Sequence, residues 1–342
     1  MRQGASSPST GPGARVTRVP PAGYRAAIDL IDVLLVGGPV LVAGLGLAVA
    51  THVLGDTTPP ALALARRAQP AGAAAAVVAL VLPEGVAAGV VASLWLAVCV
   101  CATAGGVVLV GRVASGDALD VEVVRWPLAL VTLAVALAYL SVGGAWLVIS
   151  RLDLRPFDLS SDIVRLTAVH FHYAGFGMAL LGATGLACAD WMASRVSLSI
   201  GSVAAIAGPP IVALGFVTDA GLPQVGGAVV VTVAAWTIAF GTFLLATSSS
   251  ASDAAPATAR GAAQRCGRSL LLVSALSPAI PMVLAVQWAL AQHVAVPALG
   301  VSDMAATHGV LNGLGFVVAG LSGWLLAGVS SPETDATLAA TT

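Results

Sequence analysis

Charged residues are scarce in this chain, and lysine is absent altogether. Charged residues make up 9% of the 342 positions, all fifteen basic residues are arginine, and the formal net charge is −1. A nucleic-acid-binding domain usually carries a basic patch or stripe, so the composition disfavours a nucleic-acid partner. Apolar residues make up 58% of the chain, and its mean hydropathy is +0.96. This composition is typical of an integral membrane protein whose partner is the lipid bilayer, because soluble domains contain about 25% charged residues.

Cysteines and catalytic motifs are also sparse. The four cysteines have no metal-ligand spacing, which disfavours a zinc ribbon or a disulfide framework: Cys99, Cys101, Cys188 and Cys266. The chain contains no CxxCH, GxSxG, HExxH or SxxK motif, so no attachment site for c-type haem and no known hydrolase centre is indicated. The sequence therefore favours a protein that is not an enzyme, and it names no cofactor.

Long apolar segments follow one another along the chain. A bilayer core about 30 Å thick requires roughly 20 apolar residues of helix. The segments that approach this length are 30–53, 61–82, 86–110, 126–149, 163–188, 198–217, 225–246, 268–290 and 304–328. The second is the weakest, because Arg66 and Arg67 leave only residues 71–82 free of charge. We therefore predict an all-α bundle of about nine transmembrane helices in the cell membrane, or eight if the second segment does not cross.

Polar segments flank the predicted membrane domain. Residues 1–28 and 330–342 are polar and are expected to be disordered, on either side of a helical domain at 29–329. Arginines are more frequent in the loops after the odd-numbered segments, which the positive-inside rule assigns to the cytoplasm. The four arginines of the N-terminal segment would then lie outside, unless only eight segments cross. The orientation of the N-terminus stays open.

Two histidines interrupt the fifth apolar segment, in the stretch "SSDIVRLTAVHFHYAGFGMALLG". Residues two apart on a helix are rotated by about 200°, so His170 and His172 point to nearly opposite sides and are expected to meet different helices. An unbroken helix cannot direct both to one metal ion. Because ionisable groups inside a membrane are costly, they indicate a functional site unless they serve only to hydrogen bond neighbouring helices.

The last apolar segment contributes a further histidine, in "MAATHGVLNGLGF". His308 and Asn312 are four residues apart and share one helix face. The loops before His170 and His308 are separated by four crossings and therefore open on the same side of the membrane, which the arginine distribution makes extracytoplasmic. Tyr173 shares the face of His170, so it joins the candidate site. Arg165 and Glu84 lie near the same side and are further candidates.

The histidine motifs resemble those of the YndJ-like family of bacterial membrane proteins. The resemblance runs from about Pro39 to Leu326 and includes the stretch "LPEGVAAGVVASLW". Ten positions match the two histidine motifs: His170, His172, Tyr173, Gly175, Phe176, His308, Gly309, Asn312, Gly315 and Phe316. The resemblance implies a helical membrane protein and favours transport, since the family is often labelled transporter-like, but it implies no substrate. The long polar N-terminus and the less proline-rich first span depart from the family pattern.

Two functions fit these features. The first is a transporter-like permease for a small solute or ion, in which the candidate residues bind substrate or relay protons at an extracytoplasmic site, since histidine titrates near neutral pH. The alternative is a membrane redox protein in which His170, His172 and His308 ligate haem or another metal, for which neutral imidazole is suited. Substrate, coupling ion, transport direction and oligomeric state are not encoded in any recognisable motif.

Overall fold

The computed structural model describes residues 29–117, 126–248 and 259–328, and nearly all of these are helical. The predicted all-α membrane-type fold is confirmed. The α-helices are α1 (Leu30–Gly37), α2 (Ala43–Leu54), α3 (Pro60–Val81), α4 (Val86–Ala114), α6 (Pro127–Arg151), α7 (Ser161–His170), α8 (Met178–Ala187), α9 (Met192–Thr218), α10 (Gly221–Ser248), α11 (Ala259–Leu276), α12 (Pro281–Ala291), α13 (Val301–Met304) and α14 (Ala319–Ala327).

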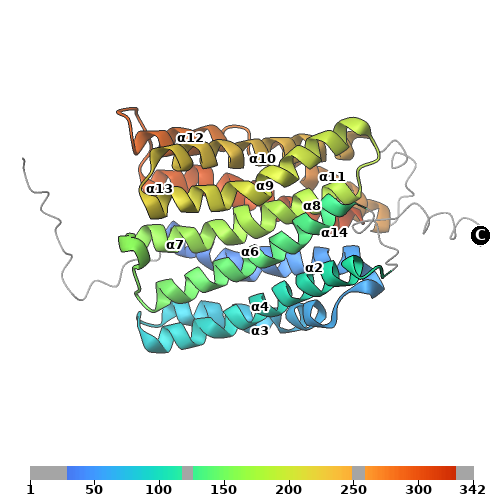
Figure 1. The fold of residues 1–342 in the computed structure, drawn as a ribbon. Helices are drawn as coiled ribbons and strands as arrows, with labels where there is room; N and C mark the ends of the chain where they lie inside the picture. Colours follow the sequence, from blue (N-terminus) through green and yellow to red (C-terminus); the bar gives the residue numbers. More distant parts are fainter. Residues whose placement is uncertain (1–28, 118–125, 249–258, 329–342) are drawn as a thin grey trace, which may run out of the picture.

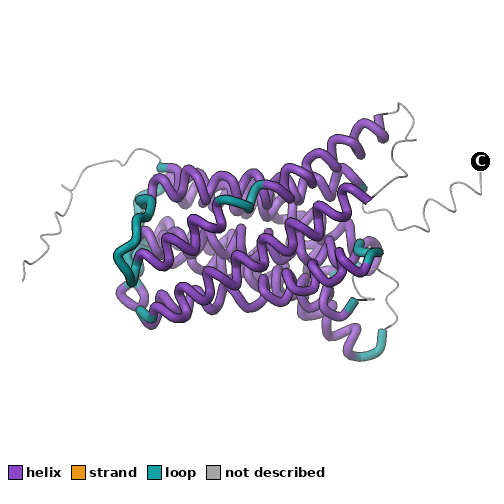
Figure 2. The backbone as a smooth tube through the Cα atoms, turned by 90° about the horizontal axis from the view of Figure 1, so that it is seen from above, coloured by secondary structure: helices purple, strands orange, loops and turns teal. Residues whose placement is uncertain are grey.

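Short π-helical segments join some of these helices into longer rods. Gly38–Val42 joins α1 to α2, Phe171–Gly177 joins α7 to α8, and the pair Ala305–Gly309 and Leu311–Val318 joins α13 to α14. A turn at 277–280 separates α11 from α12 and lies partway along the bundle in Figure 2. The described rods lie side by side along one axis (Figure 1), as expected of a membrane bundle.

Seven of the described helical stretches are long and apolar enough to cross a membrane. The two remaining rods are α3 and the rod that runs from α7 to α8. The first carries Arg66 and Arg67, and the second carries Asp162, Arg165 and the paired histidines. A count of nine crossings stays a prediction, since these two rods have the length of a membrane span without matching its apolar composition. The proposed polar ends of the chain, 1–28 and 330–342, lie outside the described residues.

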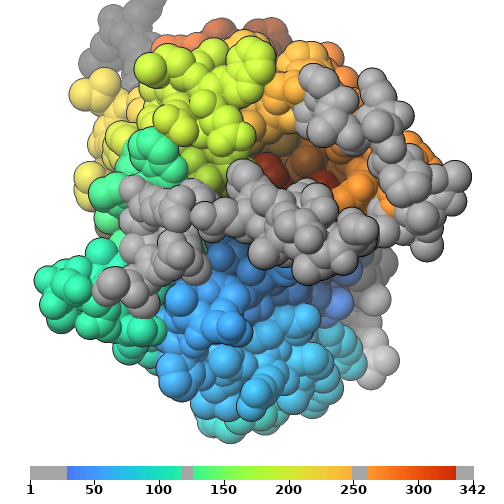
Figure 3. Space-filling model, turned by 90° about the vertical axis from the view of Figure 1, so that its right-hand side faces the viewer, coloured from blue at the N-terminus to red at the C-terminus, as the bar shows by residue number. Residues whose placement is uncertain are grey.

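Both histidine-bearing rods begin at the same end of the bundle (Figure 1). The turns at 82–85, 152–160, 219–220 and 292–300 lie there too, and we name this the Glu84 end. The arrangement agrees with the prediction that the loops before His170 and His308 open on one side. Figure 3 faces the opposite end, where the first helices occupy the lower half and α8 and α9 the upper half.

The rod from α7 to α8 forms the centre of the bundle. Every residue of α8 is buried, and the rod contacts the first rod, α6, α9 and α10. Glycines permit this close packing: a Cβ at Gly185 of α8 would lie 2.9 Å from Leu198 of α9, and one at Gly182 would lie 3.1 Å from Ile238 of α10. Small residues at helix interfaces allow such approach in membrane bundles. The centre is therefore fixed by shape rather than by charge.

The π-helical segments contact one another where three rods meet. Gly38–Val42 touches Phe171–Gly177, and both touch Leu311–Val318. Pro39 lacks a backbone N–H, and its carbonyl oxygen accepts a 2.8 Å hydrogen bond from the buried amide of Gln69 in α3. Such widened turns occur frequently at functional sites. Their junction lies next to the candidate histidines.

A buried arginine closes the Glu84 end. Arg151 is 7% exposed, and its guanidinium donates to the carbonyl oxygens of Ala79 (3.1 Å) and Leu82 (3.0 Å) and to Glu84 (3.1 Å). Ala79 lies in the last turn of α3 and Leu82 follows its last residue, where carbonyls lack intrahelical donors. The planar fork of arginine suits this task, so Arg151 ties the end of α6 to the turn before α4.

We expect Arg151→Leu to destabilise the protein, because each buried carbonyl left without a donor costs about 1–3 kcal/mol. Arg155→Leu is the matched control, since Arg155 is half-exposed and its one ion pair among the described residues is with Asp153 at the surface. Such pairs contribute about 0–1 kcal/mol. Thermal unfolding of the two detergent-solubilised variants measures the difference. Equal melting temperatures for both would contradict this role of Arg151.

Candidate functional site

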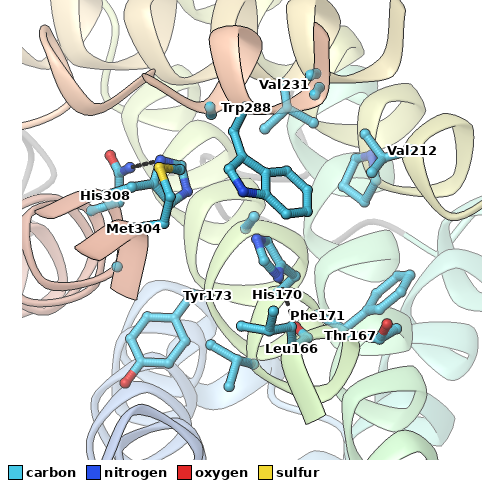
Figure 4. Close-up of a pocket in the computed structure, with 18 of the residues that line it drawn as sticks. Leu166, Thr167, His170, Phe171, Tyr173, Val212, Val231, Trp288, Met304 and His308 are labelled. Carbon is cyan, nitrogen blue, oxygen red and sulfur yellow. Dashed lines mark hydrogen bonds between the residues drawn. The ribbon is translucent and has the colours of Figure 1, made fainter. Parts of the chain in front are cut away.

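His170 and His308 meet inside the bundle. Their ring centroids are 6.4 Å apart, although the residues lie on two different rods (Figure 4). His170 is exposed despite its position within the bundle, and His308 is partly buried. Both rings border a cavity.

The cavity has a volume of about 250 Å³ and lies between α7, α9, α10, α12 and α13. Its lining extends from Leu159 and Val301, at the starts of the two histidine rods, to Met178 and Val317 near their middles. The volume is slightly below the range of about 300–1,000 Å³ typical of small-molecule sites. The cavity thus reaches from the Glu84 end to about mid-bundle.

Backbone carbonyls fix the orientation of both rings. Nδ1 of His170 lies 2.7 Å from the carbonyl oxygen of Leu166, and Nδ1 of His308 lies 2.9 Å from that of Pro281. Because a carbonyl oxygen can only accept, each Nδ1 carries the hydrogen of a neutral imidazole. The Nε2 atom of each ring is then an acceptor with a free lone pair. The turn at 277–280 matters here, since it places Pro281 at the start of α12 beside His308.

Tyr173 and Asn312 complete the polar part of the lining. The Tyr173 hydroxyl donates to the carbonyl oxygen of Leu34 at 3.1 Å, which connects the cavity wall to α1. The amide nitrogen of Asn312 lies 3.2 Å from Nδ1 of His308 and 3.4 Å from the sulfur of Met282. Since that Nδ1 already donates to Pro281, the sulfur is the acceptor that remains for the amide. Among the described residues, the Asn312 carbonyl oxygen is buried without a partner.

His172 faces away from this cavity. It is fully buried, its Nε2 accepts a 3.1 Å hydrogen bond from the indole of Trp95, and its Nδ1 donates to Ala168 at 2.8 Å. The indole and imidazole rings are stacked. A Cβ at Gly143 would lie 2.7 Å from this imidazole, so α6 passes close by. Both nitrogens of His172 are therefore used within the bundle.

Arg165 lies at the Glu84 end and holds α7 to the start of α1. Its guanidinium pairs with Asp29 (2.7 Å), Asp32 (2.6 Å) and, at 3.5 Å, Asp162. Burial raises the pKa of Asp29, but the hydrogen bonds and charge of Arg165, with the backbone N–H of Asp32, lower it, so that the net pKa falls below its ordinary value. Arg165 is therefore ion-paired at the Glu84 end and does not line the cavity.

The structure brings four of the seven sequence candidates to the cavity, namely His170, Tyr173, His308 and Asn312. It places the other three elsewhere: His172 against Trp95, Arg165 in the aspartate cluster, and Glu84 on Arg151. Within the described residues, no group of three or more His, Cys, Asp or Glu side chains could hold a metal ion. His172 lies apart from the pair of His170 and His308, because it points to the other side of its helix and packs against Trp95.

Two cavity residues have no distinguishing signal in the sequence. Trp288 stands at the end of an apolar segment, where a tryptophan at the membrane interface is the ordinary interpretation. It lies instead beside His170 in the cavity (Figure 4). Gln224 is 4% exposed and lines the cavity, and its amide oxygen accepts a 2.5 Å hydrogen bond from Nε2 of His293. The contact between Gln224 and His293 could not be predicted from the sequence, because it depends on the packing of α10 against residues 292–300.

Comparison with known proteins gives a family but no activity. A family model described as YndJ-like protein matches residues 33–316. This range is 284 of the 342 residues (316 − 33 + 1), well over half of the chain, so the chain belongs to the YndJ-like family. No curated protein and no solved structure gives a significant match.

We predict that His172→Ala lowers stability while His170→Ala does not. The first substitution leaves the Trp95 N–H without an acceptor, at a cost of about 1–3 kcal/mol, and opens a void as well. The second removes a ring that already borders open space, so little packing is lost. Thermal unfolding of the two variants in the same detergent compares them. A loss for His170→Ala as large as that for His172→Ala would contradict the assigned roles.

Proposed function

We propose that this member of the YndJ-like family is a transporter-like permease for a small solute, with the cavity around His170 and His308 as its binding site. The observation that carries the proposal is the meeting of these two rings, from rods far apart in sequence, in a cavity that reaches from one end of the bundle to about its middle. Alternating access requires a site at such a depth. The arginine distribution makes the Glu84 end extracytoplasmic.

Helix interruptions beside the cavity support the proposal. The rod from α11 to α12 is broken at 277–280, and His308 hydrogen bonds the carbonyl oxygen of Pro281, the first residue after the break. Broken helices near the middle of the membrane commonly form the substrate sites of transporters. By contrast, α9 continues through Pro209 and Pro210, of which Pro209 lines the cavity. The break in α11 and α12 is therefore the more informative of the two proline sites.

We predict that His170→Ala and His308→Ala reduce solute flux into proteoliposomes. Loss of one substrate hydrogen bond worth about 1.4 kcal/mol corresponds to about tenfold in affinity. The assay covers protons, sodium, potassium and a panel of small neutral solutes, and it follows uptake into sealed vesicles. His52→Ala is the matched control, because His52 is an exposed histidine of α2 that does not line the cavity. Flux in the two cavity variants equal to that of wild type would reject the proposal.

A metal-binding redox protein is the second candidate, and one observation favours it. Metal-ligating histidines commonly donate their other ring nitrogen to a backbone carbonyl, as His170 and His308 both do. Two imidazoles alone make an incomplete ligand set, so a bound haem or ligands from outside the protein would have to complete it.

Elemental analysis and the absorption spectrum of the purified protein distinguish the two candidates. The redox candidate predicts a stoichiometric metal or a Soret band that disappears in both His170→Ala and His308→Ala. The permease proposal predicts protein without stoichiometric metal whose spectrum is the same in all three forms. His52→Ala again serves as the control for nonspecific binding by a surface imidazole.

A further inference from the structure

We infer that the cavity accepts an uncharged, mainly apolar molecule with a hydroxyl group, whose hydrogen is donated to the Nε2 atom of His170 or of His308. The inference rests on the proposed function, because it takes this cavity to be the substrate site, and it specifies the class of substrate. Four features of the lining carry it: the absence of charge, the use of its donors, the acceptors that remain, and its size.

No charged side chain lines the cavity within the described part of the chain. The carboxylate cluster of Asp29, Asp32 and Asp162 at the Glu84 end is paired with Arg165. An ion entering an apolar space without a counter-charge loses its hydration without replacement, which costs far more than the transfer of a neutral group. A charged solute is therefore disfavoured, and within the proposed function the lining selects against free ions.

The hydrogens of the lining side chains are largely used by backbone carbonyls. Thr167 donates to Ile163 at 2.7 Å, and Tyr173 donates to Leu34 at 3.1 Å. The Nδ1 atoms of the two histidines donate in the same way. These side chains can therefore act towards the cavity only as hydrogen-bond acceptors, so the ligand must be the donor.

The acceptors that remain are the two Nε2 atoms and the side-chain carbonyl oxygen of Asn312, which is buried without a partner among the described residues. The two Nε2 atoms belong to rings 6.4 Å apart, and each is the only lone pair of a neutral imidazole. The indole N–H of Trp288 lines the same space and donates to no acceptor within the described chain. A hydroxyl group can donate to an imidazole and accept from an indole at once, which an ether, a hydrocarbon or an ammonium group cannot.

The cavity suits a molecule of about one ring. An apolar cavity of about 150 Å³ is enough to bind benzene, and this one has a volume of about 250 Å³. Phe171, Phe216, Trp288 and Phe316 provide flat aromatic walls. Aromatic surfaces favour stacked or edge-to-face contact with a second ring. A small phenol can pack its ring against these walls while its hydroxyl donates to one of the two imidazoles.

The test uses three probes that differ in one group, namely 4-methylphenol, 4-methylanisole and toluene. The full-length protein is purified in one detergent, and binding is followed by tryptophan fluorescence, because Trp146 and Trp288 line the cavity. The double variant His170→Phe with His308→Phe keeps ring-sized side chains but has no ring nitrogen. We expect wild type to bind 4-methylphenol about tenfold more tightly than the other two, and the double variant to lose this preference.

Controls separate the outcomes. His52→Phe should retain the wild-type preference, because His52 does not line the cavity. If the double variant fails to fold, His170→Phe alone is used, since His170 is exposed and borders open space. Equal binding of the three probes to wild type would overturn the inference, as would tighter binding of benzylammonium or benzoate. Weak binding of every probe until bound phospholipid is removed would also overturn it, because the occupant would then be a lipid chain.

The binding assay and the flux assay fail independently. Histidine-dependent flux of protons or metal ions, without preference for 4-methylphenol, would leave the permease proposal standing and reject the hydroxyl ligand. Histidine-dependent binding of 4-methylphenol without flux of any solute would reject transport and retain the ligand class. Flux of 4-methylphenol that depends on both histidines would support the two together.

Discussion

Most side-chain hydrogen-bond donors in the described part of the bundle donate to backbone carbonyls. The hydroxyls of Thr103 and Ser274, the amide of Gln69 and the guanidinium of Arg151 all donate to carbonyl oxygens of neighbouring helices. In an apolar interior an unpaired donor is expensive, so such bonds decide which helix faces can meet. The position of each rod follows from this requirement and from the fit of small residues. Charge contributes at the Glu84 end, where Arg165 pairs with the aspartates at the start of α1.

The same requirement separates two histidines that the sequence places almost side by side. His172 has an acceptor and a donor within reach, so both of its nitrogens are satisfied in a closed interface. Among the described residues, the partner of His170 is the carbonyl of Leu166 in its own helix, and its ring borders a cavity. Packing thus gives His172 a structural role between helices and leaves one nitrogen of His170 available to a ligand in the cavity. Residue type alone does not distinguish them.

Apolar composition and helical length predicted the fold class directly, because a chain so poor in charge must bury its backbone polar groups in helices when it lies in a bilayer. The parity of the crossings also placed the loops before His170 and His308 on one side. The contributions of Trp288, Gln224 and the Pro281 carbonyl could not be predicted, because each depends on helices that are distant in sequence. A tryptophan near a span end looks the same whether it faces lipid or a cavity.

The sequence by itself determined a helical membrane protein of the YndJ-like family and the opposite directions of His170 and His172, since helical geometry alone rotates neighbouring side chains apart. Only the tertiary structure decided that His308 lies across from His170 and that the indole of Trp95 donates a hydrogen bond to His172. It also decided that Arg165 is neutralised by aspartates of α1. The reason is physical: helical geometry sets the direction of a side chain, whereas the packing of other helices decides what that side chain meets.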